Sequence, residues 1–225
     1  MIVLTGASGG IGLEIIEELS KLDDVLAIYN TSKPKDIALK NVTFHKIDIS
    51  NPDEIKNFID QESSNLKDVT LINLAAVSID GLLANYGIDD WEEVMSINLS
   101  SNFLFSRYLI PIMIKDKWGR IIHVSSTNSA IGAGAYSSSK SGLEGLSKAL
   151  SREYARYNIT SNIIKLGVFD TGMFHKLSDK NKKTFLDLVP SKKLGKTTNI
   201  LNAIDFLINS EFVNGASITI DGGSS

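Results

Sequence analysis

A tyrosine and a lysine stand four residues apart in the segment AYSSSKSGL, at Tyr136 and Lys140. On a helix, this spacing places both side chains on one face, where they can meet a common ligand. A free tyrosine has a pKa of about 10, so proton exchange near neutral pH needs a nearby cation, which Lys140 can supply. The pair is therefore a candidate general acid and base. A packed aromatic ring beside an extended lysine gives the same spacing, so the pair alone does not establish catalysis.

A glycine-rich run, TGASGGIG, occupies residues 5–12, directly after a strand-like segment and before a helix-like one. In that position a glycine turn leaves the N–H groups of the first helical turn open, and these favour a phosphate. The run therefore predicts a cradle for a dinucleotide, and a tight turn without a ligand is the alternative. The cradle residues are Gly6, Ser8, Gly9, Gly10, Ile11 and Gly12.

The residues after the second apolar run indicate which dinucleotide is preferred. Asn30, Thr31, Ser32 and Lys33 include no carboxylate for a ribose 2′-hydroxyl, but their hydroxyls and ammonium group can meet a 2′-phosphate. This favours NADP(H), with NAD(H) as the alternative. The acidic pair at residues 23–24 precedes that run and is predicted to be a solvated turn.

These motifs require a frame of alternating strands and helices. Apolar runs rich in Val and Ile predict buried strands, and the segments between them have the 3.6-residue apolar spacing of helices. Such alternation predicts a Rossmann-type, doubly wound α/β fold with a mostly parallel sheet of about seven strands and helices on both faces. We expect one domain over residues 1–225, with a mobile lid at about 167–196. The predicted strands are residues 2–5, 25–29, 42–47, 69–74, 120–125, 160–166 and 217–220.

Composition narrows the class of protein. The chain has 225 residues, 43% of them hydrophobic, and a net charge of −3, with no basic footprint for nucleic acid. No apolar run approaches the roughly 20 residues that span a bilayer, so we expect no membrane association and a cytoplasmic location. There is no cysteine, and His45, His123 and His175 lack ligand spacing, so no metal site is predicted.

Taken in order, the motifs resemble those of the short-chain dehydrogenase/reductase family over essentially the whole chain. The resemblance is closest to the 3-oxoacyl-[acyl-carrier-protein] reductase branch. The matching landmarks are TGASGGIG, Asp48, NLAA at 73–76, Asn98 in SINLSS, GRIIHVSS at 119–126, YSSSK at 136–140, LGVFDTGM at 166–173 and ITIDGG at 218–223.

The resemblance implies an enzyme that exchanges a hydride between a nicotinamide cofactor and a ketone or secondary alcohol. By position, Ser126 bonds the reacting oxygen and Tyr136 passes the proton. Lys140 binds the nicotinamide ribose and lowers the pKa of Tyr136, and Asn98 holds a proton-relay water. A 3-oxoacyl thioester is the implied substrate, and sugars or other alcohols are left open. Beyond the cradle, the cofactor residues are Asn30, Thr31, Ser32, Asp48, Ile49, Asn73, Ala75, Ala76, Tyr136, Lys140, Gly167, Val168 and Thr171.

Several of these residues also have ordinary structural interpretations. Ser126 can be a strand-end serine, with Ser125 as the alternative site residue. Asp48 and Asn98 suit a turn or a helix entry, and Thr171 suits a helix N-cap.

The chain also departs from the family pattern. The usual Asn-Asn-Ala-Gly is NLAA, and the usual Pro-Gly is Leu166-Gly167, which favours a more mobile lid. Gly9 stands where NADP-preferring relatives often carry arginine. The loop at 127–135 is shorter than is typical, which weakens substrate assignment by analogy.

Partners and alternative functions stay open at this stage. Lys117 and Arg156 are the candidate basic residues beside the cleft for an acyl-carrier protein, although Tyr157 stands where an arginine is expected. The resemblance implies a homodimer or homotetramer, and the apolar run FLFSRYLIPIMI suits either an interface or a core. Phe169, Met173 and Phe174 either line an apolar pocket or pack the lid. The alternative functions are a sugar dehydrogenase or epimerase, or a non-catalytic NAD(P)(H)-binding sensor or scaffold.

Overall fold

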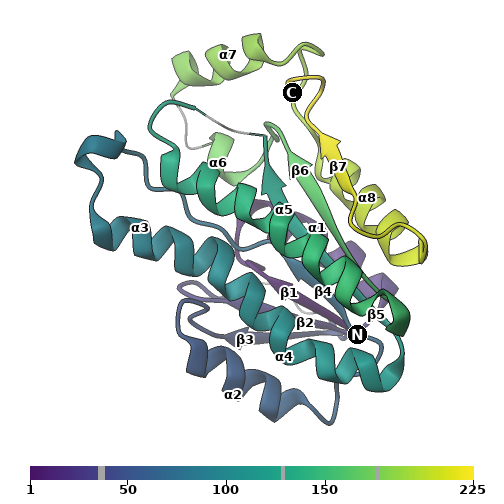
Figure 1. Ribbon diagram of the computed structural model, residues 1–225. Helices are drawn as coiled ribbons and strands as arrows, with labels where there is room; N and C mark the ends of the chain where they lie inside the picture. The colour runs from purple at the N-terminus through teal and green to yellow at the C-terminus, as the bar shows by residue number, and fades with distance from the viewer. Residues whose placement is uncertain (35–38, 128–129, 176–177) are drawn as a thin grey trace.

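Seven parallel strands form one sheet in the order β3-β2-β1-β4-β5-β6-β7 (Figure 1). The computed structural model describes residues 1–34, 39–127, 130–175 and 178–225. Strand order reverses beside β1, where β1 pairs with β2 on one side and β4 on the other. Such a reversal opens a crevice at the carboxyl ends of the strands. The strands are β1 Ile2–Thr5, β2 Val25–Tyr29, β3 Val42–Lys46, β4 Thr70–Asn73, β5 Gly119–Ser126, β6 Ile159–Leu166 and β7 Ser217–Ile220.

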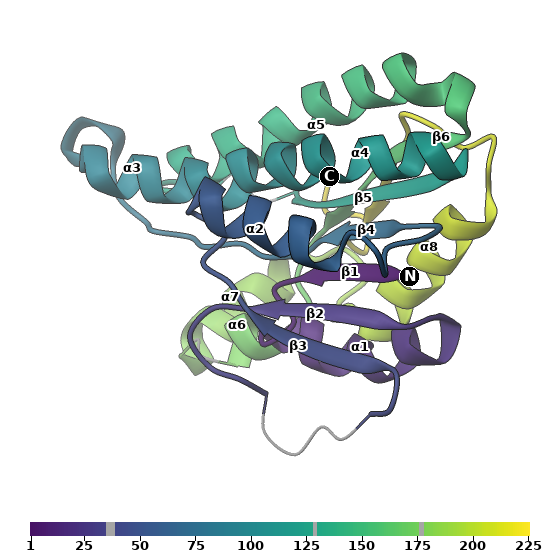
Figure 2. The ribbon, with the colours of Figure 1, turned by 90° about the horizontal axis from the view of Figure 1, so that it is seen from below.

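Helices cover both faces of the sheet. Figure 2 shows α2, α4 and α5 on one face and α1 on the other. The helices are α1 Gly10–Leu22, α2 Pro52–Glu62, α3 Ile88–Met95, α4 Ser101–Asp116, α5 Gly134–Tyr154, α6 Gly172–His175, α7 Asp179–Leu188 and α8 Thr197–Asn209. Shorter helical turns are η1 Leu83–Asn85, η2 Ser96–Ser100 and η3 Ala155–Tyr157.

The two helical layers bury separate apolar clusters. On the first face, Ile15 and Leu19 of α1 and Ile204 of α8 pack on the sheet. On the second face, Phe105 and Leu109 of α4 pack with residues of α2 and the strands. The central strands are buried on both sides, which explains why their sequences are apolar throughout rather than alternating.

Local sequence signals set the start of individual helices. The side chain of Asn51 accepts a hydrogen bond from the Asp53 N–H, and Pro52 takes the first helical position of α2. At α1, by contrast, Gly9 occupies the N-cap position and provides no side-chain cap. The open end of α1 faces the crevice, which makes it a site for an anion.

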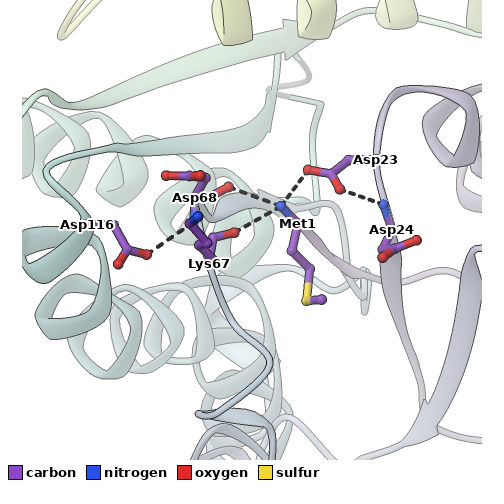
Figure 3. Close-up of polar contacts among 6 residues, drawn as sticks. All are labelled: Met1, Asp23, Asp24, Lys67, Asp68 and Asp116. Carbon is purple, nitrogen blue, oxygen red and sulfur yellow. Dashed lines mark hydrogen bonds and ion pairs between the residues drawn. The ribbon is translucent and has the colours of Figure 1, made fainter.

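Polar contacts tie together the loops at the amino edge of the sheet (Figure 3). The Met1 ammonium group contacts the carboxylate of Asp23 and the backbone carbonyls of Lys67 and Asp68. The Asp68 N–H donates to Asp116 at the end of α4. Asp23 is therefore an ion-paired turn residue at the edge opposite the crevice, not only a solvated one.

The predicted fold class is confirmed. Every predicted strand is present, with boundaries within one residue, and Tyr136 and Lys140 both lie on α5 as expected. Within the described parts of the chain, no helix is long and apolar enough to cross a membrane. Residues 128–129 of the short loop, residues 176–177 of the predicted lid and the side chain of Met173 lie outside what is described.

Candidate active site

Ser126 and Tyr136 meet at the carboxyl edge of the sheet. β5 ends at Ser126, and α5 begins at Gly134, two residues before Tyr136. The Ser126 side chain is near enough to Tyr136 to act on the pKa of its phenol, which it lowers. Tyr136 is nearly buried and Ser126 is partly exposed, and both residues belong to the carboxyl edge of the sheet.

Lys140 lies one helical turn deeper and is almost completely buried. Its Nζ donates to the carbonyl oxygen of Val124 at 2.7 Å and lies 5.8 Å from the centre of the Tyr136 ring. Burial lowers the pKa of Lys140 from 10.5 to about 8. The alternative site residue, Ser125, donates to the backbone carbonyl of Lys140 at 3.1 Å, so its hydroxyl serves the packing of α5 on β5.

The pKa of Tyr136 differs from the sequence expectation. Burial raises it above its ordinary value of 10, and the hydrogen bond with Ser126 opposes that rise. The resemblance implied that Lys140 lowers this pKa, but the Lys140 ammonium is engaged by the Val124 carbonyl. Tyr136 is therefore a protonated phenol at neutral pH in this structure.

Asn98 does not enter a helix, as one interpretation suggested, but lies inside the π-helical turn η2 between α3 and α4. Its Oδ1 accepts from the Val77 N–H and its Nδ2 donates to the Val77 carbonyl, both at 2.9 Å. The same Nδ2 lies 3.1 Å from Ser139 Oγ on α5. π-turns are rare and often occur at functional sites. Asn98 thus joins the loop after β4 to the helix that carries Tyr136.

The glycine cradle lies where β1 turns into α1. Gly6 has a φ of +74°, and a Cβ there would lie 2.8 Å from the Ala75 backbone. A Cβ on Gly12 would lie 2.4 Å from the Gly6 carbonyl oxygen. Only glycine therefore fits at these two positions, and the uncapped first turn of α1 remains open to a ligand. These features fit the phosphates of a dinucleotide, which the cradle residues from Gly6 to Gly12 would hold.

The predicted lid touches the cradle at Gly10. A Cβ on Gly10 would lie 2.5 Å from the Gly172 nitrogen and 3.4 Å from Thr171 Cβ. Thr171 is buried beside this contact, and α6 starts directly after it. The two glycines thus allow the segment after β6 to lie against the phosphate end of the cleft.

This contact predicts a defect for Gly10→Ala. The added methyl group collides with the Gly172 backbone, so we expect the Kd for a nicotinamide dinucleotide to rise by about tenfold, corresponding to about 1.4 kcal/mol. Fluorescence titration measures it. The control is Gly145→Ala on α5, where a Cβ meets nothing within 4 Å. It should leave dinucleotide binding unchanged and gain about 0.5–1 kcal/mol of helix stability. Equal binding by both variants would contradict the role of the contact.

The residues predicted to bind the adenosine end of the cofactor differ in exposure and in hydrogen bonding. Residues 30–33 are exposed after β2. The Asp48 carboxylate accepts from the N–H and hydroxyl of Ser50, which is the turn role expected as the alternative. Ile49 is buried in the core beneath it. Asn51, rather than Asp48, caps α2.

Of the cofactor residues predicted after β4 and β6, some lie at the cleft and others are buried in the core. Ala75 lies on the cradle and Ala76 is exposed, but the Asn73 side chain is buried against His123 instead of lining the cleft. Gly167 packs on the backbone of Asp221, where a Cβ would lie 2.7 Å away. Val168 borders a separate hollow, which is also lined by Ser191 and by residues 193–196.

The proposed carrier-protein residues do not lie beside this cleft. Lys117 follows α4 and Arg156 follows α5, both at the amino edge of the sheet. α5 continues for 18 residues after Tyr136 before Arg156 follows in η3, a length of about 27 Å at 1.5 Å per residue. Arg156 donates to the Tyr157 hydroxyl and stacks over its ring. The sequence interpretation of these residues as neighbours of the cleft is therefore wrong within this chain.

The sequence did not identify two buried polar residues beneath the site as candidate functional residues. His123 and Asn102 are buried, and His123 Nδ1 lies 3.0 Å from Asn102 Oδ1. The available signal was a histidine in the middle of the apolar strand GRIIHVSS, because a buried polar group needs a hydrogen-bonding partner. No local pattern identified Asn102 as that partner.

The fold and the cleft define a class of protein: a doubly wound α/β oxidoreductase with a glycine cradle beside a serine, a tyrosine and a lysine. Residues 1–182 match the model of the short chain dehydrogenase family, so the chain belongs to that family. It is an NAD(P)(H)-dependent oxidoreductase acting on CH–OH or C=O groups, with a nicotinamide cofactor.

Individual relatives agree with this assignment. The 3-oxoacyl-[acyl-carrier-protein] reductase FabG of Buchnera aphidicola subsp. Baizongia pistaciae is 36% identical, covering 98% of this chain and 95% of the relative. FabG of Escherichia coli strain K12 and nodulation protein G of Rhizobium sp. strain N33 are each 32% identical with the same coverage. A crystal structure from Agrobacterium tumefaciens, provisionally assigned as a gluconate dehydrogenase, is 24% identical. It superposes with a TM-score of 0.90, covering 100% of this chain and 95% of that one, which shows the fold.

Proposed function

We propose that this protein reduces a ketone to a secondary alcohol with NADPH, using Tyr136 as the proton donor. The observation that carries the proposal is the placement of Ser126 at the carboxyl end of β5 and of Tyr136 in the first turn of α5, with the buried Lys140 Nζ 5.8 Å from the Tyr136 ring centre. The experiment is a turnover assay that follows NADPH oxidation with a 3-oxoacyl thioester, alongside simple ketones and sugars. Absence of turnover on all three substrate classes would overturn the proposal.

The chain's own groups account for the proton transfer. Bound NADPH supplies the hydride, with its electron pair, to the carbonyl carbon. As negative charge develops on the carbonyl oxygen, the hydroxyls of Ser126 and Tyr136 stabilise it by hydrogen bonding. Tyr136 donates its proton to that oxygen, so the C=O group becomes CH–OH and a phenolate is left.

The protonation state of Tyr136 suits proton donation during reduction. Burial keeps the Tyr136 phenol protonated, which is the form that donates. We propose that Lys140 stabilises the phenolate left after proton transfer and holds the nicotinamide ribose. Asn98 is proposed to hold a water that returns the proton.

The cofactor preference is proposed from residues 30–33. They are exposed at the end of β2 and contain two hydroxyls and an ammonium group but no carboxylate, which suits a 2′-phosphate. We propose NADP(H) over NAD(H) on this basis.

Lys33→Ala tests the preference. Loss of one ammonium–phosphate contact is expected to raise the NADPH Kd by about tenfold and leave the NADH Kd within about twofold, since a charge-assisted bond contributes about 1.5–3 kcal/mol. Parallel fluorescence titrations measure both constants. Lys40→Ala, an exposed lysine before β3, is the control. A wild-type protein that binds NADH more tightly than NADPH would refute the preference.

The proposed substrate class is 3-oxoacyl thioesters, as the names of the FabG relatives suggest. The chain is proposed to form one domain with a lid at residues 167–196, which includes α6 and α7. α7 has no buried residue, which is compatible with movement over the cleft. An acyl-carrier protein and a homodimer or homotetramer are proposed partners, and the cytoplasmic location stays a prediction.

A further inference from the structure

A histidine lies beneath the candidate catalytic groups and takes no part in the mechanism above. His123 belongs to β5, between the apolar residues Ile122 and Val124, and is completely buried. Burying an imidazole without hydrogen bonds is costly. The contacts of this ring therefore indicate what it does.

Among the described residues, the polar contacts of the His123 ring are made by its nitrogen Nδ1. It lies 3.0 Å from Asn102 Oδ1 and 3.2 Å from the amide nitrogen Nδ2 of Asn73. The Asn102 amide nitrogen donates to the Asn98 carbonyl, so its oxygen accepts, which assigns the proton to Nδ1. The Asn73 amide nitrogen is also a donor, so it lies beside the protonated Nδ1 without sharing a hydrogen bond with it. Nε2 then keeps a lone pair, with no partner among the described residues. This arrangement is less costly than a buried N–H without an acceptor.

From this histidine, hydrogen bonds continue to the catalytic helix. Asn102 Nδ2 donates to the Asn98 carbonyl oxygen at 3.1 Å. Asn98 Nδ2 lies 3.1 Å from Ser139 Oγ, which donates to the Tyr136 carbonyl at 2.7 Å. The path therefore runs from β5 through α4 and the π-turn to the first turn of α5. Each of its side chains is buried.

We propose that His123 and Asn102 are positioning residues, which set the Asn98 carbonyl and, through Asn98, the position of Tyr136. The inference rests on the proposed roles of Asn98 and Tyr136. Asn98 lies in a π-turn, where the regular i to i+4 hydrogen-bond pattern of an α-helix is interrupted. The amide of Asn102 supplies a donor to the Asn98 carbonyl, and His123 fixes the amide.

His123 acts as a neutral hydrogen-bond donor rather than as a proton carrier. Burial, with a smaller contribution from the charge of Lys140, lowers its pKa to about 3. The ring thus stays uncharged at every pH at which the enzyme would be assayed. A proton-carrying histidine would instead add a limb to the pH–rate profile.

The variants His123→Leu and Asn102→Leu test the proposal. Each is expected to lower kcat for ketone reduction by about tenfold, with the substrate KM and the NADPH Kd within about twofold of wild type. The double variant should lose no more than either single variant, because both break the same path. His123→Asn should retain most of kcat, since an asparagine amide can place an N–H near the position of Nδ1.

The controls replace an asparagine and a histidine that lie outside this hydrogen-bonded path. Asn162→Leu removes a buried asparagine of β6 that bonds to Val213 and Ala216. His45→Leu removes a half-buried histidine on the edge strand β3. Thermal unfolding of all variants accounts for losses of fold. If the path variants lose no more kcat than controls of equal Tm, or if His123→Asn loses as much as His123→Leu, the proposal is overturned.

A second readout is independent of turnover. The ¹⁵N NMR shifts of the His123 ring in the full chain should report a neutral imidazole with its proton on Nδ1 between pH 6 and 9, a state that Asn102→Leu disturbs. A proton on Nε2, or a charged ring, would refute the arrangement. An inactive wild type with the expected shifts would refute the proposed function and, with it, the positioning role. An active wild type with unaffected path variants would refute the positioning role alone.

Discussion

Replacing Tyr136 with phenylalanine is expected to lower kcat for ketone reduction by about 10³-fold, within the 10²–10⁴-fold range of general acid catalysis. The phenol is the group proposed to donate the proton, and Ser126 is proposed only to hydrogen-bond the carbonyl oxygen. The ring itself is retained, so the packing of α5 should not change. Steady-state turnover with saturating NADPH measures the loss.

The matched control is Tyr154→Phe on the same helix. Tyr154 packs against the second apolar cluster near the far end of α5 and should lose less than twofold in kcat. The NADPH Kd of Tyr136→Phe should stay within about threefold of wild type, which separates loss of proton donation from loss of cofactor. Full turnover by Tyr136→Phe would eliminate the proposed mechanism.

Lys140→Met is expected to lower kcat/KM by about 10²- to 10³-fold, because it removes the buried charge proposed to stabilise the phenolate and to hold the nicotinamide ribose. Methionine approximates the length of the lysine stem, so the aliphatic contacts are largely retained. Lys148→Met, an exposed position two turns further along α5, is the control and should leave kcat/KM unchanged. Equal activity of the two variants would argue against a role for Lys140.

The same variant tests the lowered pKa of Lys140 without any substrate. Its pKa is about 8 in the folded chain and near 10.5 when unfolded, so between these values the unfolded chain binds more protons. The unfolding free energy of wild type should therefore rise with pH across this window, relative to Lys140→Met, by about 3 kcal/mol in total. At pH 7 the charged lysine carries its full desolvation cost, and the advantage of methionine is largest there.

Urea unfolding of both proteins at pH 7.5 and pH 10 measures this difference. Other lysines and tyrosines titrate alike in the two chains and cancel in the comparison. A difference in unfolding free energy that is the same at both pH values would show that burial does not lower the pKa of Lys140.

The sequence by itself determined the features that depend on neighbours along the chain. Apolar runs and helical spacing predicted the strands and the α/β class, and the i, i+4 spacing placed Tyr136 and Lys140 on one helical face. The TGASGGIG run predicted the cradle, because the need for glycine at Gly6 and Gly12 follows from a tight turn between one strand and one helix.

Only the tertiary structure decided the features that depend on long-range contacts. In the folded chain the Ser125 hydroxyl donates to the Lys140 carbonyl, whereas Ser126 lies near Tyr136. The Asn98 side chain accepts a hydrogen bond from the Val77 N–H, 21 residues away in the sequence. The tertiary structure also placed Lys117 and Arg156 at the amino edge of the sheet, since both follow helices that run away from the crevice.

The buried path from His123 to Tyr136 has the same physical origin. Its members come from β5, α4, a π-turn and α5, which have no periodicity in common. Once these elements pack, a buried polar group without a hydrogen bond costs free energy, and hydrogen bonds are stronger in the low-dielectric interior. Both effects favour hydrogen bonds among these side chains. Residue types and spacing thus determined the class of chemistry, while packing decided which polar atoms meet and what proton states they hold.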